Sequence, residues 1–124
     1  MEQRWLIVSM MVMGLGASVV FGSDAQLAQL ATKHVRLTQK IVHEYKHKNS
    51  STAIALTKEL ESGQKKLGSK VHNREISNLL KYLNLCVADM KKVLQKPYSN
   101  QNSHKLTDLS ASLMEGNRYI AKTL

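Results

Sequence analysis

The sequence predicts an all-α protein folded as an antiparallel up-down-up-down four-helix bundle. Apolar residues recur at three- and four-residue steps through four segments after residue 23, and short polar stretches separate these segments. The single proline, Pro97, falls in one of the polar stretches. No segment after residue 23 has the two-residue alternation of a half-buried strand. Four amphipathic helices joined by short turns bury their apolar stripes by packing against one another.

The first predicted helix begins at Asp24 and ends at the polar stretch KNSST, residues 48–52. Its apolar stripe consists of Leu27, Leu30, Ala31, Val35, Leu37, Ile41, Val42 and Tyr45. His34 and Thr38 fall inside the same stripe, so we expect both side chains to lie in the interior.

The second predicted helix follows a serine cap, at Ser50 or Ser51, and ends at Gly68 and Ser69. The third begins near Asn73 and stops before the proline, because the residue that precedes a proline is pushed out of helical conformation. The fourth follows the polar turn YSNQNS, residues 98–103. Its apolar positions are Leu106, Leu109, Leu113, Gly116, Ile120 and Leu124.

Residues 1–22 have the organisation of a secretory signal peptide. A short charged start is followed by residues 5–20, which carry no charge, and by small residues that favour cleavage after Gly22. We therefore predict a signal peptide over 1–22, a four-helix-bundle domain over 23–124 and a periplasmic location. The alternative is an uncleaved anchor in the inner membrane, for which this segment is at the short end.

The formal net charge of +9 resides in the exported domain, because Glu2 and Arg4 cancel. Behind a signal peptide, this charge favours small anions, anionic lipid head groups or acidic proteins as partners. Nucleic acid is not expected, since the lysines are scattered and no aromatic stacking platform accompanies them. The lone cysteine, Cys86, lies in an apolar run and is predicted to be a small buried side chain.

His43-Glu44-Tyr45-Lys46-His47 spells H-E-x-x-H, the spacing of a zinc-protease helix. A catalytic zinc site needs a third ligand, and no later segment offers a convincing one. The apolar stripe turns Tyr45 inward and both histidines outward. His43 and His47 are therefore candidate metal ligands only under the alternative hypothesis of a metal-handling protein. As a pair they would bind metal ions without selectivity.

Other catalytic and cofactor motifs do not occur in the sequence. It has no C-x-x-C-H for covalent haem, no Ser/His/Asp arrangement and no glycine-rich phosphate loop. Its carboxylates are too few for a di-iron bundle, which needs two E-x-x-H motifs where this chain has one, Glu44 to His47. The sequence therefore predicts a non-enzymatic protein without a cofactor.

Residues 31–41, in the first helix, resemble the start of the PilJ-type periplasmic sensor domain shared by nitrate/nitrite sensor kinases and type IV pilus chemotaxis transducers. The family pattern reads small-Gly-x-Gln-Arg-Met-Leu-Ser-Gln-Arg. The chain keeps Ala31, Leu37 and Gln39, with a hydroxyl at Thr38 and a basic residue at Lys40, and departs at Thr32, His34, Val35 and Arg36. The order of the later helices is similar as well.

This resemblance implies a four-helix bundle that binds a small anion at a dimer interface formed by the first helix. The family's anion-clamping arginine corresponds to Val35, which has no charged donor. Lys33, Arg36 and Lys40 are spaced i, i+3, i+7 and could form a shifted anion patch; otherwise they are the solvated side of the helix.

The implied function is a free-standing ligand-binding relative of chemoreceptor and nitrate-sensor input domains, active in signal transduction or chemotaxis. It would bind a small anion or small molecule, form a homodimer through the first helix, or partner a membrane receptor. A basic periplasmic helical chaperone or stress protein is the main alternative, beside the His-based metal-handling protein.

Overall fold

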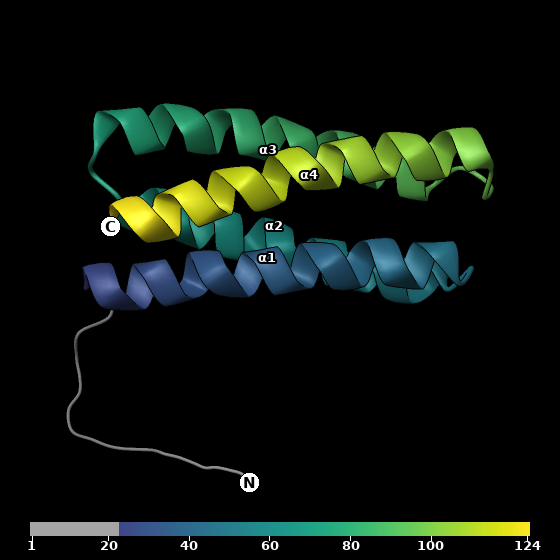
Figure 1. Cartoon of the computed structure of the whole chain (residues 1–124), viewed down its shortest axis with the longest axis horizontal. Coiled ribbons are helices and arrows are strands. Elements are labelled where there is room, and N and C mark those ends of the chain that lie inside the picture. The colour runs from purple at the N-terminus through teal and green to yellow at the C-terminus, as the bar shows by residue number, and fades with distance from the viewer. Residues whose placement is uncertain (1–22) are drawn as a thin grey trace, which may run out of the picture.

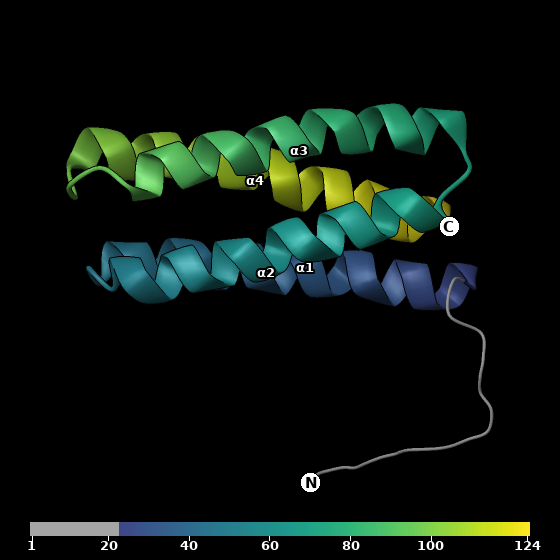
Figure 2. The ribbon, with the colours of Figure 1, turned by 180° about the vertical axis from the view of Figure 1, so that it is seen from behind.

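A computed structural model describes residues 23–124 and confirms the predicted four-helix bundle. The helices are α1 (Asp24–Lys46), α2 (Ser50–Lys70), α3 (Arg74–Leu94) and α4 (Asn100–Thr123). α1 packs on α2 and α4, and α3 packs on the same two helices. Figures 1 and 2 show α1 and α2 as one layer of the bundle and α3 and α4 as the other. The predicted signal peptide, residues 1–22, lies outside the described residues.

Three helices begin with a side-chain cap. Ser23 Oγ accepts a hydrogen bond from the backbone of Gln26 at 3.2 Å, which starts α1. Asn73 and Ser99 cap α3 and α4 in the same way, at 3.1 and 3.0 Å. Each cap satisfies one of the backbone N–H groups that the first turn leaves unpaired. The predicted start of the third helix near Asn73 is therefore confirmed.

The predicted serine cap of the second helix is wrong by one residue. Asn49 occupies the cap position without a capping hydrogen bond, and Ser50 and Ser51 lie inside α2. The Asn49 amide instead donates to Glu44 Oε1 at 3.1 Å. Lys48 adopts a left-handed backbone with φ of 64°, so the chain reverses within a turn of three residues.

The predicted end of the second helix at Gly68 and Ser69 is also wrong, because α2 continues to Lys70. The Ser69 hydroxyl donates to a backbone carbonyl of its own helix, at 2.8 Å, and does not break it. The chain leaves the helix at Val71, which is extended and only 6% exposed. α2 thus ends next to a buried, extended valine and not at the glycine.

The core is aliphatic but contains a set of buried polar side chains. Among its fully buried members are Leu60, Leu83, Leu113 and Ile120, and Cys86 is buried as predicted. The buried polar residues are His34, Thr38, Thr57, Gln64, Ser103, Ser110 and Asn117. None of the described helices, α1 to α4, combines the length and the apolar character that crossing a bilayer requires.

Candidate functional site

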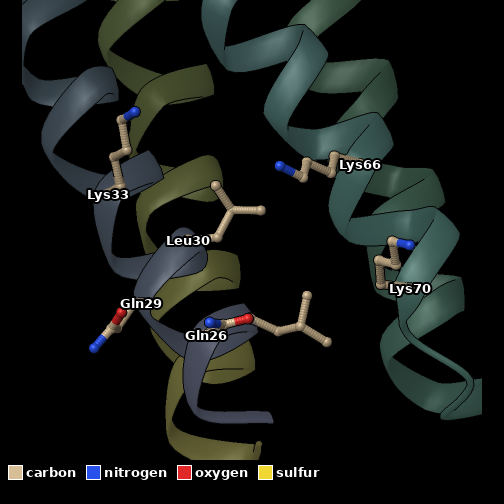
Figure 3. Close-up of a pocket in the computed structure, with 7 residues that line it drawn as sticks. Gln26, Gln29, Leu30, Lys33, Lys66 and Lys70 are labelled. Atoms are coloured by element: carbon tan, nitrogen blue, oxygen red, sulfur yellow. The ribbon is translucent and has the colours of Figure 1, made fainter. Parts of the chain in front are cut away.

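A groove of about 270 Å³ lies between α1 and α2, beside the first turns of α1 and the last turns of α2. Leu27 and Leu30 provide apolar surface, and Gln26 and Gln29 lie on the same helix. Figure 3 shows Leu30 of α1 and Lys66 of α2 reaching into the space between the two helices. The site therefore offers an apolar surface next to cationic side chains.

Three lysines line this groove, Lys33 from α1 and Lys66 and Lys70 from α2. The antiparallel packing of the two helices brings them together, although 33 and 66 are far apart in sequence. Lys33 also forms a salt bridge of 3.4 Å with Glu59 of α2. Both of its partners are half exposed or more, so this bridge is weak and open to competition from another anion.

The residues of the predicted anion patch, Lys33, Arg36 and Lys40, do not line one common groove. Lys33 lines the α1–α2 groove, whereas Arg36 lines a separate groove between α1 and α4, beside Arg118. Lys40 is exposed on α1 and is among the lining residues of neither groove. The three-residue step from Lys33 to Arg36 leaves the two side chains about 60° apart around the helix axis. This offset is enough for them to face different neighbouring helices.

Val35 lies mostly inside the protein. It is 8% exposed and lines the α1–α4 groove with Thr32 and Ala121. An aliphatic side chain here supplies packing and no donor for an anion.

His43 and His47 lie at the end of α1, and both are exposed. Their ring centroids are 4.2 Å apart, but Nδ1 of His47 is 2.8 Å from the carbonyl oxygen of His43 and is engaged there. Within residues 23–124, no three His, Cys, Asp or Glu side chains are grouped so that they could hold a metal ion. The pair alone lacks the ligand number of a structural or catalytic zinc site.

The interior holds a second chemical feature, the contact of His34 with Asn117. His34 Nδ1 lies 3.2 Å from Asn117 Oδ1, so α1 and α4 are joined by a buried hydrogen bond. Burial lowers the pKa of His34 below its ordinary value of 6.5, against the opposing effect of the hydrogen bond to Asn117. Gln64 lies close enough to influence the imidazole, yet its amide has no well-formed hydrogen-bond partner among the described residues.

Lys66 and Lys70 were not predicted as site residues from the sequence, although their i, i+4 spacing puts them on one face of the second helix. The signal that could have found them is the antiparallel order itself. It brings the end of the second helix beside the start of the first, where Gln26, Gln29 and Leu30 lie.

Comparisons with protein-family models, with curated proteins and with solved structures each found no match to this chain.

Proposed function

We propose that the protein is a non-enzymatic, ligand-binding helical bundle of the sensor-like kind, and that its ligand is a small anion with an apolar part. The observation that supports this proposal is the α1–α2 groove, in which Leu27 and Leu30 adjoin Lys33 and Lys66. A carboxylate would interact with the ammonium groups while its hydrocarbon chain covers the leucines.

The expected affinity is modest. Burying a methylene group contributes about 0.8 kcal/mol, and an exposed ion pair contributes roughly 0.2–1 kcal/mol. A six-carbon carboxylate in an open groove would thus have a dissociation constant on the order of 1 mM, which corresponds to about 4 kcal/mol. Nitrate lacks the apolar part and would bind more weakly than this.

In this proposal the chain acts in the periplasm, and the ligand changes a surface that another protein contacts. The ligand would compete with Glu59 for Lys33 and so alter the link between α1 and α2. The exposed face of α1 carries Arg36, Lys40 and Lys46. An acidic surface of a membrane receptor fits this face better than a second copy of the chain, because like charges oppose a symmetric dimer through α1.

The experiment is isothermal titration calorimetry of the full-length protein with hexanoate, nitrate and hexanol. Hexanoate has both a charge and an apolar chain, nitrate has only the charge, and hexanol has only the apolar chain. We expect saturable binding of hexanoate, weaker binding of nitrate, and no saturable binding of hexanol. Lys33→Gln and Lys66→Gln should each weaken hexanoate binding, by up to about fivefold.

Lys81→Gln on α3 is the matched control, since Lys81 is exposed and lies outside the groove. It removes the same unit of charge and should leave the affinity for hexanoate within about twofold, because a distant exposed charge is screened. No saturable heat with either anion, or an equal loss with Lys81→Gln, would exclude the proposed site.

A further inference from the structure

A second groove, between α3 and α4, carries the opposite charge to the first. Its volume is about 460 Å³. The two helices that line it form the other layer of the bundle (Figures 1 and 2). The residues that matter for its chemistry are Glu75, Leu79, Tyr82, Glu115, Gly116 and Tyr119. No lysine or arginine lines it, although Lys and Arg outnumber Asp and Glu two to one, 18 to 9, in the chain.

Close packing of α3 on α4 forms the floor of this groove. A Cβ atom added to Gly116 would lie 2.7 Å from Cδ2 of the buried Leu83, so any larger residue would require Leu83 to shift. The rest of the floor includes Leu79, which is partly buried against the core. The floor is therefore apolar and fixed by the packing of the two helices.

The tyrosines are held by hydrogen bonds while their rings stay accessible. The Tyr119 hydroxyl donates to Glu75 Oε1 at 2.9 Å, and the Tyr82 hydroxyl lies 3.5 Å from Ser112 Oγ. The exposed fractions are 52% for Tyr82 and 43% for Tyr119. Two positioned aromatic rings that face solvent are suited to contact a ligand rather than to fill the core.

The combination of carboxylates and aromatic rings selects the charge of the ligand. An anion would be repelled by Glu75 and Glu115, and the groove contains no cationic group to offset them. A compact organic cation gains from both features, since its charge is attracted to the carboxylates and to the faces of aromatic rings. A hard metal ion would need more oxygen ligands than two carboxylates supply.

We propose that the α3–α4 groove binds a small organic ammonium ion, with Glu75 and Glu115 balancing its charge and Tyr82 and Tyr119 contacting its methyl or methylene groups. This site is independent of the anion groove between α1 and α2, and either can exist without the other. The ammonium group can belong to a free amine or to a lysine side chain of another protein.

The experiment is a nuclear magnetic resonance titration of the ¹⁵N-labelled full-length chain with tetramethylammonium chloride. We expect saturable shifts of the backbone amides of Tyr82, Gly116 and Tyr119, with sodium chloride at the same ionic strength producing none. Absence of saturation up to about 20 mM, far above the ~1 mM scale of weak small-ligand binding, would overturn the proposal. Saturable shifts confined to other residues would overturn it as well.

The test variant is Glu75→Gln/Glu115→Gln, and the matched control is Asp89→Asn/Asp108→Asn. Each removes one carboxylate from α3 and one from α4, but Asp89 and Asp108 lie outside the groove. We expect the test variant to weaken binding by about five- to tenfold and the control to change it by less than about twofold. An equal effect of both would show that only net charge matters, which contradicts the proposed site.

A tyrosine pair of variants separates the ring from the hydroxyl. Tyr119→Leu removes the ring and should weaken binding, whereas Tyr119→Phe keeps the ring and should retain most of the affinity. Nα-acetyl-lysine amide serves as a second probe of the same variants. Tighter binding of this probe than of tetramethylammonium would identify a protein lysine as the source of the cation, and the reverse would identify a free amine.

Discussion

His34 Nδ1 lies 3.2 Å from Asn117 Oδ1 in the interior of the bundle, which ties α1 to α4. The Asn117 amide nitrogen donates to the carbonyl oxygen of Leu113 at 2.9 Å, so Oδ1 is the atom that faces the histidine. The neutral imidazole must therefore carry its proton on Nδ1 and donate it to Asn117. Nε2 is left without a hydrogen-bond partner among residues 23–124.

The stability of the protein should fall on acidification because of His34. Burial lowers the pKa of His34 in the folded state below its ordinary value of 6.5, so the unfolded chain binds a proton first as the pH falls. The stabilisation is complete above about pH 6.5 and is lost progressively below it, with a slope of up to about 1.4 kcal/mol per pH unit. Urea unfolding between pH 7.5 and 5, in steps of about half a unit, measures this slope.

His34→Gln supplies the comparison for this measurement. The variant keeps a polar side chain of similar length but cannot titrate, so its free energy of unfolding should depend less steeply on pH than that of the parent. Identical slopes for the two proteins would show that His34 does not cause the acid sensitivity.

Gly63→Ala should destabilise the protein, although alanine is the better helix former. A Cβ atom at this position would clash with Nε2 of His34, which is 1% exposed and held by Asn117. The clash should outweigh the gain of about 1 kcal/mol in helix propensity, with a net loss of about 1–3 kcal/mol in the free energy of unfolding. Thermal and urea unfolding of the variant measure this loss.

Gly68→Ala is the control for helix propensity in the same helix. A Cβ atom at Gly68 would have nothing within 4 Å, and the residue is exposed. This variant should be more stable than the parent by roughly 0.5–1 kcal/mol. If Gly63→Ala were also stabilising, the close approach of α2 to His34 would not constrain the fold.

The four helices could be predicted from the sequence because each has an apolar stripe at helical spacing, and such stripes are buried in only a few ways. Helix ends were predicted less well. Asn73 and Pro97 act locally and gave correct limits, whereas Gly68 lies inside α2, which ends at Lys70 beside the buried Val71. A local sequence preference does not determine the helix end where a tertiary contact contributes more free energy.

The grooves could not be predicted from spacing along one helix. Lys33 and Arg36 share a face in the sequence pattern, yet they line different grooves because α1 has a neighbour on each side. The contact of Glu75 with Tyr119 joins residues 44 positions apart and depends on how α3 and α4 are rotated. A small rotation of either helix about its axis would break this contact, although its apolar stripe, about 100° wide, would still face the core.

Cys86 should react slowly with thiol reagents in the folded protein. It is 4% exposed, and burial raises the pKa of its thiol, so little of the reactive thiolate is present at pH 8. We expect alkylation by iodoacetamide to require unfolding, and its rate to rise with urea concentration through the unfolding transition. Ala88→Cys in a Cys86→Ala background places a thiol at an exposed position of the same helix and should react rapidly in native buffer. Equal rates for the two proteins would contradict the burial of Cys86.

Exchanging the two partners of the salt bridge between Lys33 and Glu59 should separate stability from ligand binding. Lys33→Glu/Glu59→Lys keeps the net charge and can re-form the bridge across α1 and α2 with the charges reversed. Since an exposed pair contributes only about 0.2–1 kcal/mol, the free energy of unfolding should change by less than about 1 kcal/mol. The carboxylate now lies at position 33, which lines the anion groove, whereas position 59 is outside its lining.

Hexanoate binding to this variant should therefore be lost while the fold and the net charge are preserved. Calorimetric titration beside urea unfolding measures both quantities on the same sample. Lys33→Gln alone provides the intermediate case, with weakened but detectable binding. The exchange moves the positive charge from position 33 to position 59 and keeps the net charge, so it abolishes a local contact with Lys33 but leaves the overall positive field unchanged. Retained hexanoate binding would therefore show that this overall field attracts the anion.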